Sequence, residues 1–180
     1  VFDGTKVEPY IETDPTRPIN VYGKSKLEGE MHVAAVAEKY YVVRTAWLFG
    51  PTKNNFVPWV LEVAKSQPSL HLIDDQWGSP TYVADLAEGI SWLAREAPLY
   101  GVYHVVNRGQ CTRKQLAEMA ISAAGLLTPV EGIPMSALPR PAPRPARTPL
   151  RNWALDLRGG WNARPYQEAL EDFVRSWLSG

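Results

Sequence analysis

Short apolar runs alternate with helical stretches along this chain, and that alternation restricts its fold more than any other feature of the sequence. Runs rich in Val, Ile, Leu and aromatic residues predict short buried strands at 40–44, 70–73 and 102–106. Helical periodicity predicts helices before, between and after them, at about 21–39, 56–65, 83–95 and 113–124. We therefore expect an α/β protein with a doubly wound parallel sheet.

Capping residues and prolines mark where these elements begin and end. Asn20 and Thr112 precede two of the helices as candidate N-caps, and Pro165 can start a last helix that runs to about Leu178. Six prolines lie between Pro134 and Pro149. Such a density of proline predicts an extended surface or binding loop in place of regular structure.

Composition excludes several classes of function. The 180 residues include 19 basic and 19 acidic residues, so the chain has no net charge to attract nucleic acid or an anionic membrane. A hydrophobic content of 45% excludes intrinsic disorder, and no apolar run approaches the roughly 18 residues that cross a bilayer. One cysteine, Cys111, cannot form an internal disulfide, and the three histidines lack metal-ligand spacing: His32, His71 and His104. We expect a cytoplasmic protein.

A tyrosine and a lysine form the strongest candidate site. Tyr22 and Lys26 are four residues apart on the helix predicted at 21–39, so their side chains share one face. A phenol has a reference pKa of about 10, and both a neighbouring ammonium and a helix N-terminus favour its ionised form. The pair therefore predicts a general acid for reducing a carbonyl, with the lysine also able to hold a diol. The alternative is a solvated helix face with this spacing by chance.

Further segments accompany this pair: Val1-Phe2-Asp3-Gly4-Thr5, Pro9-Tyr10, Tyr22-Gly23-Lys24-Ser25-Lys26-Leu27-Glu28-Gly29-Glu30, Arg44-Thr45-Ala46-Trp47-Leu48-Phe49-Gly50, Gln76-Trp77-Gly78-Ser79-Pro80-Thr81, Asp85-Leu86-Ala87 and Arg144-Pro145. Together they resemble the dTDP-4-dehydrorhamnose reductases, a family of extended short-chain dehydrogenases. The resemblance is dense over residues 1–50, patchy to 150 and faint beyond. It implies an NAD(P)-binding Rossmann-like sheet whose amino-terminal strands lie outside this chain, joined to a small α/β substrate-binding part.

The resemblance also implies how the chain is divided and what it does. Residues of about 1–55 and 78–108 would belong to the cofactor-binding domain, and about 56–77 and 109–180 mainly to the substrate-binding part. The implied reaction reduces the C4 ketone of a dTDP-4-keto-6-deoxysugar to give dTDP-L-rhamnose, with NADPH or NADH as cofactor. A homodimer is left open.

Three residues receive roles from the resemblance. Tyr22 would protonate the C4 oxygen as hydride arrives, and Lys26 would hold the nicotinamide ribose. Trp47 would lie against the deoxysugar, with a core tryptophan as the alternative. Some members of the family bind magnesium through acidic residues at a dimer contact, and Asp85 lies near one such position, but we do not predict it as a metal ligand.

Two parts of the family pattern are missing from these residues. The chain begins at Val1, after the Thr or Ser and the Asp that precede this segment in the family, and no Gly-x-x-Gly-x-x-Gly or Gly-x-Gly-x-x-Gly turn occurs in it. We therefore expect the carboxy-terminal portion of a longer reductase, inactive by itself. The alternatives are a sister sugar-nucleotide reductase or epimerase, and a non-catalytic binding protein of the same fold, such as the regulatory subunit of methionine adenosyltransferase.

Overall fold

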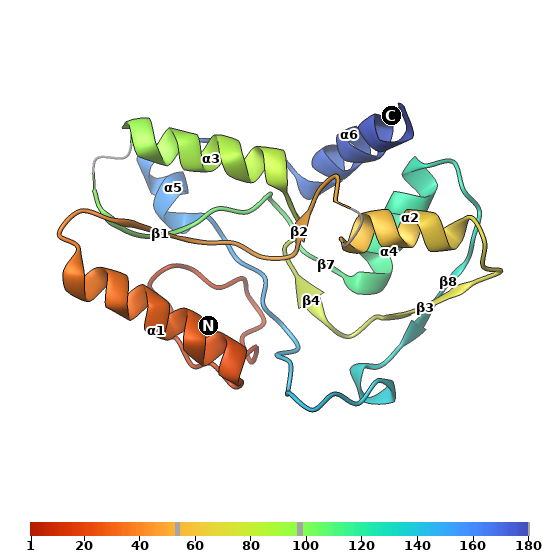
Figure 1. Cartoon of the computed structure of the whole chain (residues 1–180), viewed down its shortest axis with the longest axis horizontal. Helices are drawn as coiled ribbons and strands as arrows, with labels where there is room; N and C mark the ends of the chain where they lie inside the picture. Colours follow the sequence, from red (N-terminus) through yellow and green to blue (C-terminus); the bar gives the residue numbers. More distant parts are fainter. Residues whose placement is uncertain (53–54, 97–98, 180) are drawn as a thin grey trace.

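The computed structural model describes residues 1–52, 55–96 and 99–179 (Figure 1). Its helices are α1 (Val21–Val36), α2 (Phe56–Ala64), α3 (Val83–Glu96), α4 (Arg113–Ala123), the short 3-10 helix η1 (Met135–Ala137), α5 (Trp153–Arg158) and α6 (Tyr166–Ser179). Its strands are β1 (Tyr41–Arg44), β2 (Leu48–Phe49), β3 (Leu70–Ile73), β4 (Trp77–Gly78), β5 (Thr81–Tyr82), β6 (Gly101–His104), β7 (Cys111–Thr112) and β8 (Val130–Ile133).

Parallel strand pairs confirm the predicted α/β fold. β1 pairs with β6, with Tyr41 opposite Gly101, and β3 pairs with β8, with Leu70 opposite Val130. β2 and β5 form a third parallel pair, whereas β4 and β7 are antiparallel. Within the described residues, each pair stands as a two-stranded unit and none is joined to another in one continuous sheet.

The predicted strands differ from the observed ones mainly at their ends. The strand predicted at 70–73 is found at those residues, and β1 is half-buried where a fully buried strand was expected. β6 ends at His104, although the apolar run continues to Val106. The reason is that Val106 bonds to a side chain: its N–H donates to the Asn152 Oδ1 atom at 3.0 Å, and its carbonyl accepts from the Asn152 Nδ2 atom at 2.8 Å.

Helices lie on both sides of the β1–β6 pair. Figure 1 shows α1 on one side of this pair, with α3 and α5 on the other. Farther along the molecule, α2 packs against α4, which also contacts α6 and the β3–β8 pair. The chain thus places one group of elements around β1–β6 and a second group around α4.

Each group has its own buried cluster. The cluster around α4 includes Phe49, Val57, Leu61, Leu116, Leu170, Phe173 and Val174, and the one around β6 includes Leu93, Tyr103, Val105 and Leu155. The helical spacing of Leu170, Phe173 and Val174 predicts one apolar face for α6, and all three residues are buried in the cluster around α4. Among the described residues, no helix combines the length and the apolar character needed to cross a membrane.

α1 packs less closely than its sequence suggests. Gly23 is its one buried residue. Helical spacing predicts that Leu27, Met31, Ala34 and Ala35 form an apolar side that faces a core. In the structure Leu27 is half-buried and the other three are exposed. That expectation is wrong here because the described residues supply no apolar surface to cover this side. The helix is held instead by a two-bond ion pair between Glu30 and Arg44, at 2.6 and 2.9 Å.

Sequence patterns missed some of the short elements. β8 lies just before the proline-rich segment and is recognisable only through its pairing with β3. α5 has only six residues, too few to show helical periodicity, and it is followed by Gly159, whose left-handed φ of 60° ends the helix. The sequence predicts a loop at 74–80, and this segment contains β4. As expected, the proline-rich segment is extended after η1, and residues 136–144 are exposed.

The cysteine is a packing residue. Cys111 is 1% exposed and belongs to the cluster around α4. Burial raises the pKa of its thiol to about 12, so the thiol is protonated at neutral pH. A protonated and buried thiol is a poor nucleophile, which removes Cys111 from the candidates for covalent catalysis.

Candidate active site

The start of α1 positions the predicted tyrosine. The Asn20 side-chain oxygen accepts a hydrogen bond from the Gly23 N–H at 2.8 Å, which confirms Asn20 as the N-cap. A Cβ atom at Gly23 would lie 2.9 Å from the Pro18 Cβ atom, so glycine allows the preceding segment to pack closely on the helix. The Asn20 Nδ2 atom also donates to the Pro143 carbonyl at 2.8 Å, and this bond ties the helix to the proline-rich segment.

Tyr22 and Lys26 lie together on the first turns of α1. The Lys26 Nζ atom is 5.6 Å from the centroid of the Tyr22 ring, and the Tyr22 residue is 72% exposed. Within the described residues, neither the phenol nor the ammonium makes a hydrogen bond or ion pair with another side chain. The structure therefore brings the predicted pair together and leaves both polar groups accessible, while their roles stay predictions.

Trp47 is held in an uncommon backbone conformation. Its φ is 42°, the one positive value among the described non-glycine residues. A left-handed conformation at a bulky residue costs about 1–3 kcal/mol, and such strain is concentrated at binding and catalytic sites. A Cβ atom at Gly78 would overlap the indole, so this glycine makes room for the ring. Trp47 is half-buried, so it is neither a fully buried core residue nor a fully exposed one.

Arg113 lies over the same tryptophan. Its guanidinium carbon is 3.8 Å from the centroid of the Trp47 ring and 4.8 Å from that of Phe56. Burial lowers the pKa of Arg113 to about 10, and the nearby charges of Arg144 and Arg140 act in the same direction, while Cys111 raises it. Sequence reasoning missed Arg113, because a contact between residues so far apart in the chain has no local signal.

The proline-rich segment is bonded to the start of α1 and carries charges that act on Arg113. Trp47 makes no hydrogen bond or ring contact with Tyr22 or Lys26 in the described part of the chain. Pro143 bonds to the cap of the helix that carries the Tyr–Lys pair, and its neighbour Arg144 acts on the charge of Arg113. The proline-rich segment is therefore bonded to the start of α1, and the charge of its Arg144 acts on Arg113.

Asp85 is engaged in a structural ion pair. Its carboxylate accepts from the Arg164 Nε and Nη2 atoms at 2.8 and 3.0 Å, and from the Asn107 Nδ2 atom at 2.6 Å. Both carboxylate oxygens are thus occupied by protein donors. No group of three or more His, Cys, Asp and Glu side chains suited to a metal ion occurs among the residues that the structure describes.

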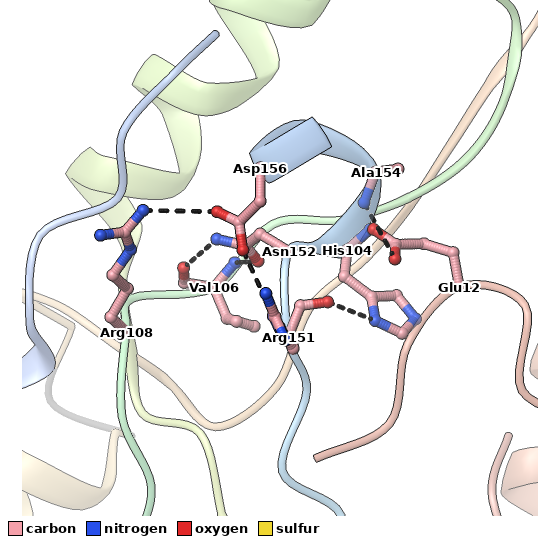
Figure 2. A network of polar contacts seen from close by, with 8 residues as sticks. All are labelled: Glu12, His104, Val106, Arg108, Arg151, Asn152, Ala154 and Asp156. Carbon is pink, nitrogen blue, oxygen red and sulfur yellow. Dashed lines mark hydrogen bonds and ion pairs between the residues drawn. The ribbon is translucent and has the colours of Figure 1, made fainter. Parts of the chain in front are cut away.

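A polar network fastens the segment before α5 to β6 (Figure 2). The His104 N–H donates to Glu12 at 2.9 Å, and the His104 Nδ1 atom contacts the Arg151 carbonyl at 3.2 Å. Glu12 also accepts from the Ala154 N–H at 3.3 Å, so one carboxylate bridges β6 and α5. Figure 2 shows Asp156 farther along the same network, where it accepts from both Arg108 and Arg151, each at 3.3 Å.

Acid should destabilise the protein through His104. The residue is 0% exposed, and burial followed by the Arg44 charge lowers its pKa to about 4. Between about pH 6.5 and 4, the unfolded chain binds a proton at this ring that the folded chain does not. Stability therefore falls as the pH is lowered through this range, by roughly 3 kcal/mol in full.

Urea unfolding of the wild type and His104→Gln across that pH range measures this contribution. The variant should show a shallower loss of stability towards pH 4 than the wild type. Equal pH slopes for the two proteins would contradict the assignment. Other acidic groups contribute to both curves alike, so the difference between them isolates the histidine.

The parallel strand pairs flanked by helices define an α/β protein, and the predicted Tyr–Lys pair lies on its first helix. A family model described as the RmlD substrate binding domain matches residues 1–178, and the chain belongs to this family. The family resemblance expected from the sequence is thereby confirmed.

Individual relatives agree with this assignment. A dTDP-4-dehydrorhamnose reductase from Burkholderia thailandensis is 38% identical, over 99% of this chain and 65% of its own length. Among solved structures, a dTDP-4-dehydrorhamnose reductase from Clostridium acetobutylicum matches with a TM-score of 0.95 and 38% identity, over 99% of this chain and 63% of its own. A dTDP-4-dehydrorhamnose reductase from Bacillus anthracis, solved in complex with NADP, matches with a TM-score of 0.93 and 37% identity, over 98% of this chain and 62% of its own. The chain spans less than two thirds of the length of these relatives.

Proposed function

We propose that the whole protein reduces the C4 ketone of a dTDP-4-keto-6-deoxysugar with NADPH or NADH, to give dTDP-L-rhamnose. The observation that carries this proposal is the accessible Tyr22–Lys26 pair on α1, in a chain of this family. The names of the similar enzymes from Burkholderia, Clostridium and Bacillus support the substrate class. A cytoplasmic location is part of the proposal, because a lone buried thiol suits a reducing compartment.

Tyr22 and Lys26 would have different roles in the reaction. The Tyr22 hydroxyl donates a proton to the C4 oxygen of the substrate, and the Lys26 ammonium donates hydrogen bonds to the ribose hydroxyls next to the nicotinamide. Both groups fit these roles because both are accessible and neither is bonded to another side chain in the described part of the chain. The nicotinamide supplies the hydride when it is bound.

The two groups of elements suggest how the chain is divided. We assign the elements around β1–β6, in residues of about 1–55 and 78–108, to the cofactor-binding domain. The elements around α4, in residues of about 56–77 and 109–180, would form most of the substrate-binding part. α5 departs from this division, because its Leu155 packs with Tyr103 and Val105 of the β6 cluster.

Steady-state turnover of the whole protein tests the proposed reaction. A dTDP-4-keto-6-deoxysugar should oxidise NADPH or NADH and yield a product that is identified by mass spectrometry and NMR. Binding of the sugar nucleotide with no turnover would favour a non-catalytic binding protein of this fold instead. Turnover with a changed configuration at another carbon would favour a sister epimerase.

The 180 residues by themselves should bind NADPH negligibly and show no reductase activity. Proteins of this fold bind the pyrophosphate of a dinucleotide mainly through a Gly-rich turn and the N-terminus of the helix that follows it. The sequence contains no such turn. Calorimetric titration of this chain with NADPH checks the expectation, with the whole protein as positive control. Micromolar binding by the 180 residues would place the cofactor site elsewhere.

Trp47→Ala should raise the KM of the whole protein for the sugar nucleotide. A tryptophan stacked at a binding site commonly contributes about 2 kcal/mol, which corresponds to a change of about 30-fold. The effect should appear in KM far more than in kcat, and thermal unfolding of the same variant provides the control. A loss of stability with unchanged KM would instead make Trp47 a core residue.

A further inference from the structure

Tyr22, Lys26 and Glu30 follow one another along α1, each four residues beyond the last. Residues at this spacing are neighbours on a helix, and a lysine and a glutamate placed in this way can form an ion pair. α4 contains such a pair in the same order, because the Lys114 Nζ atom lies 2.6 Å from the Glu118 carboxylate. Lys26, in contrast, forms no ion pair with any described residue.

Glu30 is bound instead by Arg44, the last residue of β1. The Arg44 Nε and Nη2 atoms donate to the two Glu30 oxygens at 2.9 and 2.6 Å, so both oxygens are occupied. The arginine side chain is 11% exposed and that of the glutamate 16%, and a pair buried to this extent is weakly screened by salt. A guanidinium that forms two parallel bonds also binds a carboxylate with better geometry than an ammonium does.

Aromatic residues hold Arg44 in place for this bond. Its guanidinium carbon lies 5.4 Å from the centroid of the Phe2 ring, and Phe2 stacks on Tyr10 with the ring centroids 4.1 Å apart. In the β1–β6 pair, Arg44 lies opposite the buried His104. A side chain confined in this way loses little further conformational entropy when it binds Glu30.

Removal of the arginine would leave the Glu30 carboxylate without a partner. A largely buried carboxylate that has no counter-ion is unfavourable, so it would bind a cation that it can reach. The Lys26 ammonium lies one turn earlier on the same helix. An ammonium paired with Glu30 would have to break that pair before it could donate to another group.

We propose that Arg44 is a positioning residue that acts through Lys26. By binding Glu30, it prevents the carboxylate from pairing with the Lys26 ammonium and leaves that ammonium available to the ribose of the cofactor. The ribose as the ligand rests on the proposed function, whereas the competition for Glu30 rests on the contacts of this chain alone.

Two measurements on the whole protein test this role. Calorimetry gives the affinity for NADPH, and acetylation of the protein without ligand, followed by mass spectrometry of its peptides, gives the reactivity of the Lys26 amine. The variants are Arg44→Gln, Glu30→Gln and the double variant that combines them. Arg164→Gln is the matched control, because Arg164 makes a similar two-bond pair with Asp85 of α3, across the β1–β6 pair from α1 (Figure 1).

Arg44→Gln should slow the acetylation of Lys26 and weaken NADPH binding by the same factor, about 2-fold to 5-fold, because the new ion pair must break in both cases. Glu30→Gln and the double variant should keep both values at the wild-type level, since both lack the competing carboxylate. Lys114, already paired with Glu118, is the reference for acetylation in every sample. The Arg164→Gln control should lower the melting temperature and leave both values unchanged.

Equal losses of NADPH affinity in Arg44→Gln, Glu30→Gln and the double variant would overturn the proposal, because the pair would then only attach α1 to β1. Unchanged acetylation of Lys26 in Arg44→Gln would also overturn it, and normal turnover of the ketosugar by the wild type would leave the proposed function intact. If acetylation changes as expected but NADPH affinity is the same in every variant, Lys26→Ala included, the ribose role fails and the competition for Glu30 stands.

Arg44→Lys is the second variant if Arg44→Gln does not fold. Lysine keeps a positive charge near Glu30 but cannot form the two parallel bonds, so the carboxylate should be held less firmly. Acetylation of Lys26 and NADPH affinity should therefore shift in the same direction as in Arg44→Gln, by a smaller factor. Wild-type values of both in a folded Arg44→Lys protein, together with a lowered melting temperature, would count against the proposal.

Discussion

Tyr22→Phe should lower the kcat of the whole protein by roughly 10²–10⁴, the usual contribution of a positioned general acid. Phenylalanine keeps the ring and its 5.6 Å relation to the Lys26 ammonium but removes the proton that the C4 oxygen needs. Substrate affinity should change little, since the hydroxyl acts mainly in the transition state. Steady-state kinetics with the ketosugar and NADPH gives both numbers.

A second tyrosine supplies the control for this variant. Tyr100 is also largely exposed and lies outside α1, in contact with Tyr41. Tyr100→Phe should therefore leave kcat unchanged. If Tyr22→Phe kept near-normal turnover, the general acid would have to be another group. Tyr22 and Lys26 would then be residues of a solvated helix face that have this spacing by chance.

Phe173→Ala should cost about 3–5 kcal/mol of unfolding free energy, the usual loss for truncating a buried aromatic side chain. Phe173 is 2% exposed, and its ring lies 5.8 Å from both the Phe49 and Tyr82 rings and 6.0 Å from the Trp177 ring. Phe49 and Tyr82 belong to the β2–β5 pair, so this one side chain joins α6 to that pair. Removing it leaves a cavity that the surrounding rings cannot fill.

Urea or thermal unfolding measures the effect of Phe173→Ala. For a chain of this size, the expected loss corresponds to a fall in Tm of about 10 °C. Leu178→Ala is the matched control, because Leu178 is on the same helix and half-exposed, and it should change stability by far less. A loss below about 1 kcal/mol for Phe173→Ala would mean that the helix is not anchored through this ring.

Local signals explain why much of the fold could be predicted. A capping box joins Thr112 and Gln115 at the start of α4, and Asn20 caps α1, so both starts are determined by residues next to them. The strand at 70–73 is a short apolar run with turn residues on both sides. β8 and α5 were missed because their stability comes from partners far along the chain, β3 and β6, rather than from their own sequence.

The candidate site likewise has parts that the sequence predicts and parts that only the folded structure reveals. The Tyr22–Lys26 contact follows from helical spacing alone, and Trp47 was named from the family resemblance. The left-handed backbone of Trp47 and the guanidinium stacked on it have no counterpart in local sequence. Arg113 is unremarkable as the first residue of a helix, and it becomes a site candidate only once the fold brings it over an indole.

The Asn20 amide has two bonding partners that serve different ends. Its oxygen holds the Gly23 N–H of α1, and its nitrogen holds the Pro143 carbonyl, which immediately precedes Arg144. An aspartate at position 20 would keep the first bond and lose the second, so the helix start and the attachment of the loop are chemically separable. Replacement of Asn20 by aspartate would thus release the proline-rich segment from the turn that bears Tyr22 without removing the helix cap.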